Sequence, residues 1–263
     1  MYFDVLLPSV VFIAIIASIF LQRRLEKTIF FLLEEKKLSI RDVAIIVAWM
    51  GGAVTAIVFI PSEAIQILFL SAYSYMLFSF TYISMKKWYV AILPPVIFLL
   101  SYFFYWNLIV FNLFVLIFSV MITVYISGLF SWKTVWIFAA LLTIMDVIQV
   151  FITGFMGQSV TKMIELKLPV LLMLPTYPSG STVGLGLGDL FLAGLLSIHI
   201  SSKRGVKAGV LTALMNGLAM FIFEAALLNT MFARFFPATL VVVAGSVSYT
   251  HLRAHETSLH LVC

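Results

Sequence analysis

Charge is scarce in this sequence: 10% of its 263 residues are Asp, Glu, Lys or Arg, whereas 63% are hydrophobic. So little charge excludes an ordinary soluble domain and indicates a protein of the lipid bilayer. Cysteine is nearly absent too, because the single cysteine is Cys263. A disulfide framework is therefore excluded. There is also no Asn-X-Ser/Thr sequon, so nothing indicates a glycosylated eukaryotic protein.

Long apolar runs take up most of the chain, and roughly 20 apolar residues in a helix cross about 30 Å of hydrocarbon. The runs predict an all-α, polytopic membrane protein with nine transmembrane helices, the ninth shortened. The expected helices lie at about residues 4–22, 42–61, 63–85, 88–106, 107–130, 134–154, 183–202, 207–232 and from 235 onward. The connections leave no room for a soluble catalytic domain, so any chemistry must lie among the helices.

Two connections are longer than the rest. Residues 23–41 are charged, and TIFFLLEEKK within them is too short to span a bilayer, so an amphipathic helix on the membrane surface is expected. Residues 155–182 contain three prolines, Pro169, Pro175 and Pro178, which exclude one continuous helix. The middle of this second segment can either pair as an extended strand or lie on the membrane as a lid.

The formal net charge of +5 does not indicate nucleic-acid binding, because the lysines and arginines lie in short loops between the apolar runs. Nine helices place twelve of them on one side of the membrane and three on the other. The twelve are Arg23, Arg24, Lys27, Lys36, Lys37, Arg41, Lys86, Lys87, Lys133, Lys203, Arg204 and Lys207, and the three are Lys162, Lys167 and Arg234. By the positive-inside rule, the N-terminus is expected outside, with the protein in the cell membrane. The run at 5–20 is expected to be a membrane helix and not a signal peptide, since MYFD before it has no positive charge.

The sequence changes character at its end. Residues 248–263 abandon the apolar pattern, and SYTHLRAHET resembles a translated cloning or sequencing-adapter tail. Residues 1–247 are therefore taken as the membrane domain and 248–263 as a non-native tail. The tail holds most of the histidines, but their spacing does not match a structural zinc pattern and no metal site is expected. These residues are His251, His255, His260 and Cys263.

Three acidic residues lie inside the expected helices: Asp146, Asp189 and Glu224. A charged carboxylate near the middle of a bilayer costs about 2.5–3.5 kcal/mol on insertion scales, so it usually faces a partner, a water-filled cavity or an ion path. Each of the three is therefore a functional candidate. Glu224 is expected to hydrogen-bond within the bundle, along a helix face that includes Asn216 and Met220.

Asp146 and Asp189 lie at similar depths. Asp146 precedes the outer end of the sixth expected helix by about two turns, and Asp189 follows the start of the seventh closely, so both lie about 9–12 Å from the same side. Two close carboxylates in a low dielectric do not easily ionise together and share a proton. The charged member can then take a proton from water while the neutral member protonates a peptide carbonyl, as in aspartic proteases. Gln149 either orients Asp146 or bonds a neighbouring helix, with packing favoured.

Three alternating positions just before Asp189 have no side chain: Gly184, Gly186 and Gly188. The missing side chains let another backbone approach closely and permit a local departure from helical structure. A helical substrate must be unwound before it can be cut, and the alternating glycines can present an extended edge to it. Plain helix packing is the alternative explanation of these glycines.

Gly186, Leu187, Gly188 and Asp189 read GLGD, which resembles the G-x-G-D motif of the presenilin and signal peptide peptidase group of intramembrane aspartyl proteases. The order of features is similar too: nine helices, an aspartate in the sixth, the glycine motif opening the seventh and a Pro-Ala motif opening the ninth. That last motif resembles the family's P-A-L, whose backbone is held to shape the substrate site. It consists of Pro237, Ala238, Thr239 and Leu240. The resemblance extends to about residue 247, and the short loops look most like the archaeal presenilin homologues.

The resemblance implies an intramembrane aspartyl endopeptidase with Asp146 and Asp189 as catalytic residues, substrate-binding residues in both motifs and no cofactor. Its substrates would be transmembrane proteins or peptides that enter sideways from lipid, with the 155–182 loop as their gate. An outside N-terminus resembles signal peptide peptidase, so type II segments and signal-peptide remnants are expected substrates. Two residues depart from the family pattern: Met145 stands where tyrosine usually precedes the aspartate, and Thr239 replaces a leucine.

Three other functions remain open. A prepilin-type peptidase also carries G-x-G-D, but a lysine usually follows it, whereas Leu190 and Phe191 follow here. A secondary transporter or proton-coupled channel would use the intramembrane carboxylates to carry cations or protons. A non-catalytic chaperone or assembly factor on a protease fold would not need the aspartates at all.

Overall fold

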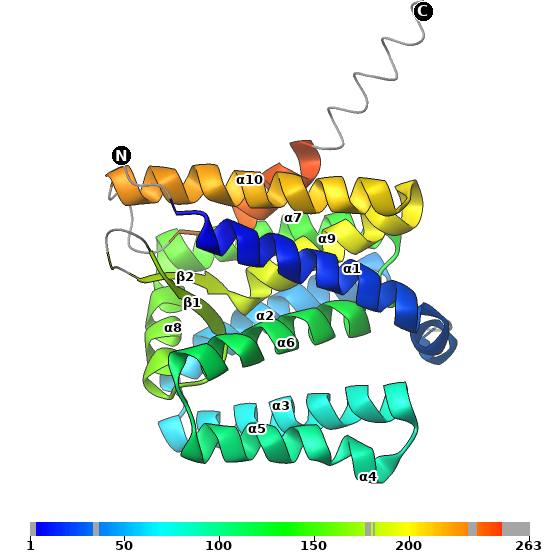
Figure 1. Ribbon diagram of the computed structural model, residues 1–263. Helices are drawn as coiled ribbons and strands as arrows, with labels where there is room; N and C mark the ends of the chain where they lie inside the picture. Colours follow the sequence, from blue (N-terminus) through cyan, green and yellow to red (C-terminus); the bar gives the residue numbers. More distant parts are fainter. Residues whose placement is uncertain (1–3, 34–36, 177–179, 181, 231–235, 249–263) are drawn as a thin grey trace, which may run out of the picture.

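The computed structural model describes residues 4–33, 37–176, 180, 182–230 and 236–248, and this part is mostly helical (Figure 1). A short antiparallel sheet and a π-helix, η1, interrupt the helices, and an apolar helix, Thr239–Ser248, comes last. The elements are α1 (Leu6–Leu33), α2 (Ile40–Phe59), α3 (Ser62–Met85), α4 (Trp88–Ala91), α5 (Leu93–Phe104), α6 (Leu108–Ser127), α7 (Trp132–Val147), η1 (Ile148–Thr153), α8 (Phe155–Glu165), β1 (Leu171–Pro175), β2 (Thr182–Gly186), α9 (Leu187–Arg204) and α10 (Val206–Thr230). Apart from Ser248, the expected tail lies outside the described residues.

Six helical stretches of the described chain are long and apolar enough to cross a membrane, which is consistent with a multi-pass membrane protein. They correspond to six of the nine expected transmembrane helices. These are Leu6–Leu25, Ile40–Phe59, Ser62–Met85, Leu108–Ser127, Trp132–Thr153 and Val206–Thr230. Two more of the nine are apolar but shorter, Trp88–Phe104 and Thr239–Ser248.

The structure bears differently on the predictions for the two longer connections, residues 23–41 and 155–182. The first part of TIFFLLEEKK is helical, because α1 continues to Leu33, beyond the apolar stretch Leu6–Leu25 that is long enough to span a membrane. That this part lies on the membrane surface stays a prediction. No proline or glycine lies between Leu6 and Leu33 except Pro8 in the first turn, so nothing in the backbone ends the helix earlier. In the segment 155–182, the break in helix is confirmed: α8 ends at Glu165 and the chain then forms β1. The extended-strand alternative is therefore the correct one.

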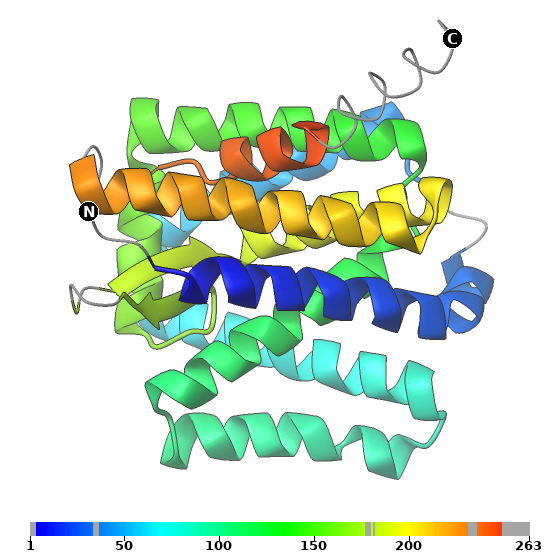
Figure 2. The ribbon, with the colours of Figure 1, turned by 45° about the horizontal axis from the view of Figure 1, so that its top comes forward.

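Helix α9 lies inside the bundle, packed against α1, α6, α7 and α10 (Figures 1 and 2). Almost all of its side chains from Asp189 to Ser201 are buried. Gly194 permits one of these close approaches, since a Cβ there would lie 2.8 Å from a side-chain carbon of Thr123 on α6. Helices α3 and α5 form an outer pair, at the bottom of Figure 1, which meets α6 through aromatic rings such as Tyr73 and Phe118, stacked with centroids 4.2 Å apart.

The hairpin β1–β2 leads directly into α9. The strands are antiparallel, with Leu172 opposite Leu185 and Met173 opposite Gly184. The expected start of the seventh helix at residue 183 is therefore wrong, because residues 182–186 form a strand and the helix begins at Leu187. Glycine is a poor helix former, and alternating glycines weaken a helix at this point. Strand β1 meanwhile supplies partners for the backbone hydrogen bonds of β2.

Candidate functional site

Asp146 lies in the last turn of α7, where the α-helix passes into the wider η1. Its side chain is buried, with 7% exposure. The hydroxyl of Thr239 donates a hydrogen bond to its carboxylate, with 2.8 Å between Oγ1 and Oδ2. The two residues are 93 positions apart in the sequence. A π-helical turn is uncommon and often marks a functional site, because it re-aims the side chains beside it.

Asp189 lies in the first turn of α9, just after β2. It is also buried, with 9% exposure. Gly186 is the N-cap residue of α9, and its backbone N–H donates to the Asp189 carboxylate. A carboxylate three residues after the N-cap is favourable because it satisfies a helix N–H that would otherwise lack a partner and faces the positive end of the helix dipole. The local sequence therefore accounts for the position of Asp189.

The structure brings Asp146 and Asp189 together, as their similar depths predict. Helix α7 packs against α9, and Asp146 is close enough for its charge to act on Asp189. Both side chains are buried, so water screens their repulsion poorly. Such a pair is most stable with one shared proton. One carboxylate can then accept a proton while its neighbour donates one.

The three glycines before Asp189 have different surroundings. A Cβ on Gly184 would lie 2.7 Å from a side-chain carbon of Leu171, and a Cβ on Gly186 would lie 2.9 Å from Oδ2 of Asp189. A Cβ on Gly188 would meet nothing within 4 Å. Gly186 thus gives room to the carboxylate itself, whereas Gly188 borders open space beside it. Leu187, between them, packs against the aromatic cluster of α3, α5 and α6.

Strand β2 has a free edge. In an antiparallel ladder, hydrogen-bonded and non-hydrogen-bonded residue pairs alternate. Leu187 donates its N–H to the Val170 carbonyl, so these two residues form a hydrogen-bonded pair. Counting back along the ladder from this pair, Gly184 and Met173 form a non-hydrogen-bonded pair. The N–H and C=O of Gly184 therefore point away from β1, and the described part of the chain offers them no hydrogen-bond partner. Without a side chain, Gly184 leaves this edge accessible to another backbone.

One residue of the Pro-Ala motif, Thr239, contacts Asp146. Thr239 and Pro237 are buried, Ala238 is half-buried, and Leu240 is 39% exposed. Thr239 is the member of the motif that hydrogen-bonds to a candidate catalytic side chain. The resemblance assigns all four residues to substrate binding, and the sequence gives no signal that the hydroxyl of Thr239 meets Asp146.

A groove of about 420 Å³ lies between α2 and the α7–η1 helix, and neither candidate aspartate lines it. Small α2 residues line one wall, and the opposite wall includes Met145 and Gln149. The Gln149 carboxamide donates to the Gly51 carbonyl at 2.7 Å, so Gln149 bonds the neighbouring helix, as the packing interpretation predicts. Gly51 is also tightly packed, because a Cβ there would lie 2.8 Å from the sulfur of Met145. Met145 thus fills space against α2.

Glu224 lies apart from this pair. It is 1% exposed, and neither of its carboxylate oxygens has a hydrogen-bond partner in the described chain. The prediction that it hydrogen-bonds along the Asn216 face is therefore wrong, because Asn216 instead donates to Ser246 on the last helix. The neighbour whose charge acts on Glu224 is Asp4, at the start of α1.

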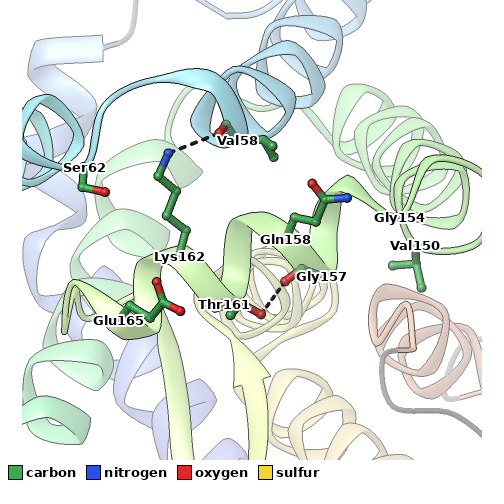
Figure 3. Close-up of a pocket in the computed structure, with 9 residues that line it drawn as sticks. All are labelled: Val58, Ser62, Val150, Gly154, Gly157, Gln158, Thr161, Lys162 and Glu165. Atoms are coloured by element: carbon green, nitrogen blue, oxygen red, sulfur yellow. Dashed lines mark hydrogen bonds between the residues drawn. The ribbon is translucent and has the colours of Figure 1, made fainter.

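A second, larger pocket of about 720 Å³ lies where the ends of α2 and η1 meet α3 and α8 (Figure 3). Lys162 extends across it and donates to the Val58 carbonyl at 3.2 Å (Figure 3). It also donates to the Ile57 carbonyl at 3.1 Å. These are unpaired carbonyls at the end of α2, which a cation stabilises. Neither candidate aspartate lines the pocket. Its lysine therefore has a structural role.

No group of three or more His, Cys, Asp or Glu side chains that could hold a metal occurs in the described ranges. The histidines and cysteine of the expected tail lie outside them. Comparison with protein-family models gives no match for this chain, and comparison with curated proteins gives none either.

Proposed function

We propose that this chain is an intramembrane aspartyl endopeptidase that hydrolyses peptide bonds within transmembrane segments. The observation that carries the proposal is the meeting of two buried carboxylates, Asp146 and Asp189, on helices that pack together. Burying two acids close together costs stability, and acids kept in such surroundings are candidates for a functional site. The resemblance of GLGD and its neighbours to presenilin and signal peptide peptidase motifs supports the same activity.

The reaction needs a water molecule and the two carboxyl groups. The charged carboxylate removes a proton from water as the oxygen adds to the peptide carbonyl carbon, while the neutral carboxyl group gives its proton to the carbonyl oxygen. The resulting tetrahedral diol then breaks its C–N bond. One hydroxyl proton returns to a carboxylate, and the leaving nitrogen takes a proton from the carboxyl group that the first step created. The products are an acid and an amine, and the dyad regains one proton.

The free edge of β2 supports a mode of substrate binding. A peptide bond inside a helix is shielded by its own hydrogen bonds, so the segment to be cut must become extended. An extended segment added beside Gly184 would gain backbone hydrogen bonds in place of those it loses. The same strand runs into the turn that carries Asp189, so the peptide would be led towards the catalytic pair.

The groove between α2 and the α7–η1 helix supports sideways entry. It is mostly apolar, and its wall includes Met145 and Gln149, the neighbours of Asp146. A transmembrane substrate could approach the α7–η1 helix there without leaving the hydrocarbon. The proposed arrangement is a presenilin-like bundle of nine transmembrane helices with an outside N-terminus, and its proposed substrates are type II segments or signal-peptide remnants. Mapping of the N-terminus to the cytoplasm with a reporter fusion would contradict this substrate orientation.

The first experiment is cleavage of a type II transmembrane peptide by the purified protein in mild detergent, with products identified by mass spectrometry. The variants are Asp146→Asn and Asp189→Asn, and Glu63→Gln serves as the control because Glu63 is an exposed acid on α3. We expect cleavage within the apolar segment by the parent and the control, and none by either asparagine variant at unchanged thermal stability.

Two results would contradict the proposal. Unchanged cleavage by one asparagine variant would remove that residue from the mechanism. Absence of cleavage by the parent on several peptides, with proton or cation uptake into liposomes that both variants lose, would show that the carboxylates serve transport instead.

A further inference from the structure

We infer that Thr239 is a positioning residue for Asp146: its hydroxyl holds Asp146 as the ionised, water-activating member of the pair and leaves the shared proton on Asp189. The inference rests on the proposed function and deepens it, because it assigns separate roles to the two aspartates.

The first step is the hydrogen bond itself. Thr239 is 4% exposed, and its hydroxyl lies 2.8 Å from Oδ2 of Asp146. The backbone N–H of Thr239 also acts on the same carboxylate. Donors aimed at a carboxylate stabilise its charged form, and such charge-assisted hydrogen bonds are stronger than neutral ones. One residue therefore directs two donors at Asp146.

The second step is the contrast with Asp189. Its carboxylate receives the backbone N–H of Gly186, and no side-chain donor from the described residues reaches it. It is also close to the charge of Asp146. When the two carboxyl groups share one proton, hydrogen bonds stabilise the charged form of Asp146 more than that of Asp189. Asp189 is then the acid that faces the peptide carbonyl.

The third step is that Thr239 is itself held in place. The helix Thr239–Ser248 is tied to α10 by a hydrogen bond of 3.1 Å from Asn216 to Ser246. Gly245 brings the two helices close, since a Cβ there would lie 2.9 Å from the Asn216 side-chain oxygen. Pro237, buried at the entrance to the helix, restricts the backbone before it. A donor that is fixed before substrate binds needs no reorganisation during the reaction.

Other charged groups on the elements packed against α7 are far from Asp146. Lys133 lies at the opposite end of α7, about 20 Å away along the helix. On α9, His199, Lys203 and Arg204 are about 15 Å or more beyond Asp189. On α2, Arg41 and Asp42 lie in its first turn, about 15 Å from Gly51, which contacts Met145. Asp189 is the titratable group of these elements that lies close to Asp146.

The residue type makes the inference specific to this chain. The P-A-L motif that these residues resemble has leucine where Thr239 stands, and leucine has no donor. Valine has nearly the shape of threonine without the hydroxyl, whereas serine keeps the hydroxyl. The pair Thr239→Val and Thr239→Ser therefore separates hydrogen bonding from packing.

The test measures kcat and KM as a function of pH for the parent, Thr239→Val and Thr239→Ser. Thr143→Val is the matched control, since the Thr143 hydroxyl is on the same helix as Asp146 but bonds the Ala139 carbonyl. We expect Thr239→Val to lower kcat about 10- to 100-fold with KM nearly unchanged. The acid limb of its pH–activity profile should also lie about one pH unit higher than that of the parent. Thr239→Ser should restore both properties, and the control should change neither.

An unchanged kcat and acid limb in Thr239→Val would overturn the inference, as would equal losses in the valine and serine variants. Infrared difference spectra, assigned with Asp146→Asn and Asp189→Asn, identify the protonated aspartate without any substrate. If the parent cleaves nothing, the proposed function fails, and the spectra still decide whether the proton lies on Asp189. A protonated Asp146 would overturn the inference in either case.

Discussion

The carboxamide of Asn112 pairs with the backbone of Met173 as a neighbouring β-strand would. Its Nδ2 donates to the Met173 carbonyl at 2.6 Å, and the Met173 N–H donates to its Oδ1 at 2.8 Å. Helix α6 therefore closes the outer edge of β1 at this residue through one side chain. No described residue hydrogen-bonds to the edge of β2 at Gly184, which gives the hairpin one side for a further strand.

Asn112→Leu should loosen the hairpin, because it leaves the N–H and C=O of Met173 without partners in a partly buried place. A loss of about 1–3 kcal/mol of local stability is expected. Amide hydrogen exchange of residues 171–175 should quicken, and peptide cleavage should fall in parallel. Ile109→Ala, on the same helix at an 80% exposed position, is the control. Unchanged exchange at Met173 would show that α6 does not hold the strand.

Gly186→Ala and Gly188→Ala should behave differently although both change the G-x-G-D motif. The backbone of Gly186 is extended, with φ −60° and ψ 141°, so alanine is allowed there, but its methyl group would meet Oδ2 of Asp189 at 2.9 Å. We expect kcat to fall by about tenfold or more, since small displacements of a catalytic group are costly. At Gly188 the methyl group meets nothing.

Gly188→Ala should therefore keep the thermal stability of the parent, and any loss of activity should come as a higher KM from obstruction of the open side. Steady-state kinetics and thermal unfolding of the two variants distinguish these effects. A clear loss of thermal stability in Gly188→Ala would contradict the open surroundings described for this residue.

Glu224→Leu should stabilise the protein. The side chain is buried, has no hydrogen-bond partner among the described residues and is repelled by the charge of Asp4. A leucine of similar volume therefore removes an unfavourable polar group. An increase in Tm of roughly 2–8 °C is expected, with cleavage unchanged. Thermal unfolding in detergent measures it, with Glu63→Gln as the exposed control. A lower Tm, or loss of activity, would mean that Glu224 has a functional partner.

Much of the helical framework follows from the sequence, because hydropathy over about 20 residues is a local property. Six of the expected helices are confirmed as long apolar helices, and Pro169 and Pro175 correctly predict a break in the 155–182 segment. The beginning of α9 could not be predicted in the same way. Residues 183–186 are apolar and glycine-rich, which fits a membrane helix or a strand, and only a partner strand distinguishes the two.

The candidate pair was also accessible from the sequence, since acids are rare in apolar segments and depth along a helix can be counted. The hydrogen-bond partners of the buried acids could not be predicted from the sequence. Within the described part of the chain, Glu224 has no hydrogen bond where one was predicted, and Thr239 has one with Asp146 where none was predicted. Both outcomes depend on how helices rotate about their axes, which hydropathy does not determine for α10, whose faces are similarly apolar.

The sequence by itself determined that this chain is built for a bilayer and that Asp146 and Asp189 are costly there, because both conclusions depend on composition and on position along single helices. The tertiary structure alone decided that Gly184 lies on a free strand edge, that Asn112 closes the other edge and that Thr239 reaches Asp146. The hydrogen bonds of Asn112 and Thr239 join residues 61 and 93 positions apart in the chain. They arise from the packing of whole elements, and local sequence patterns carry no information about it.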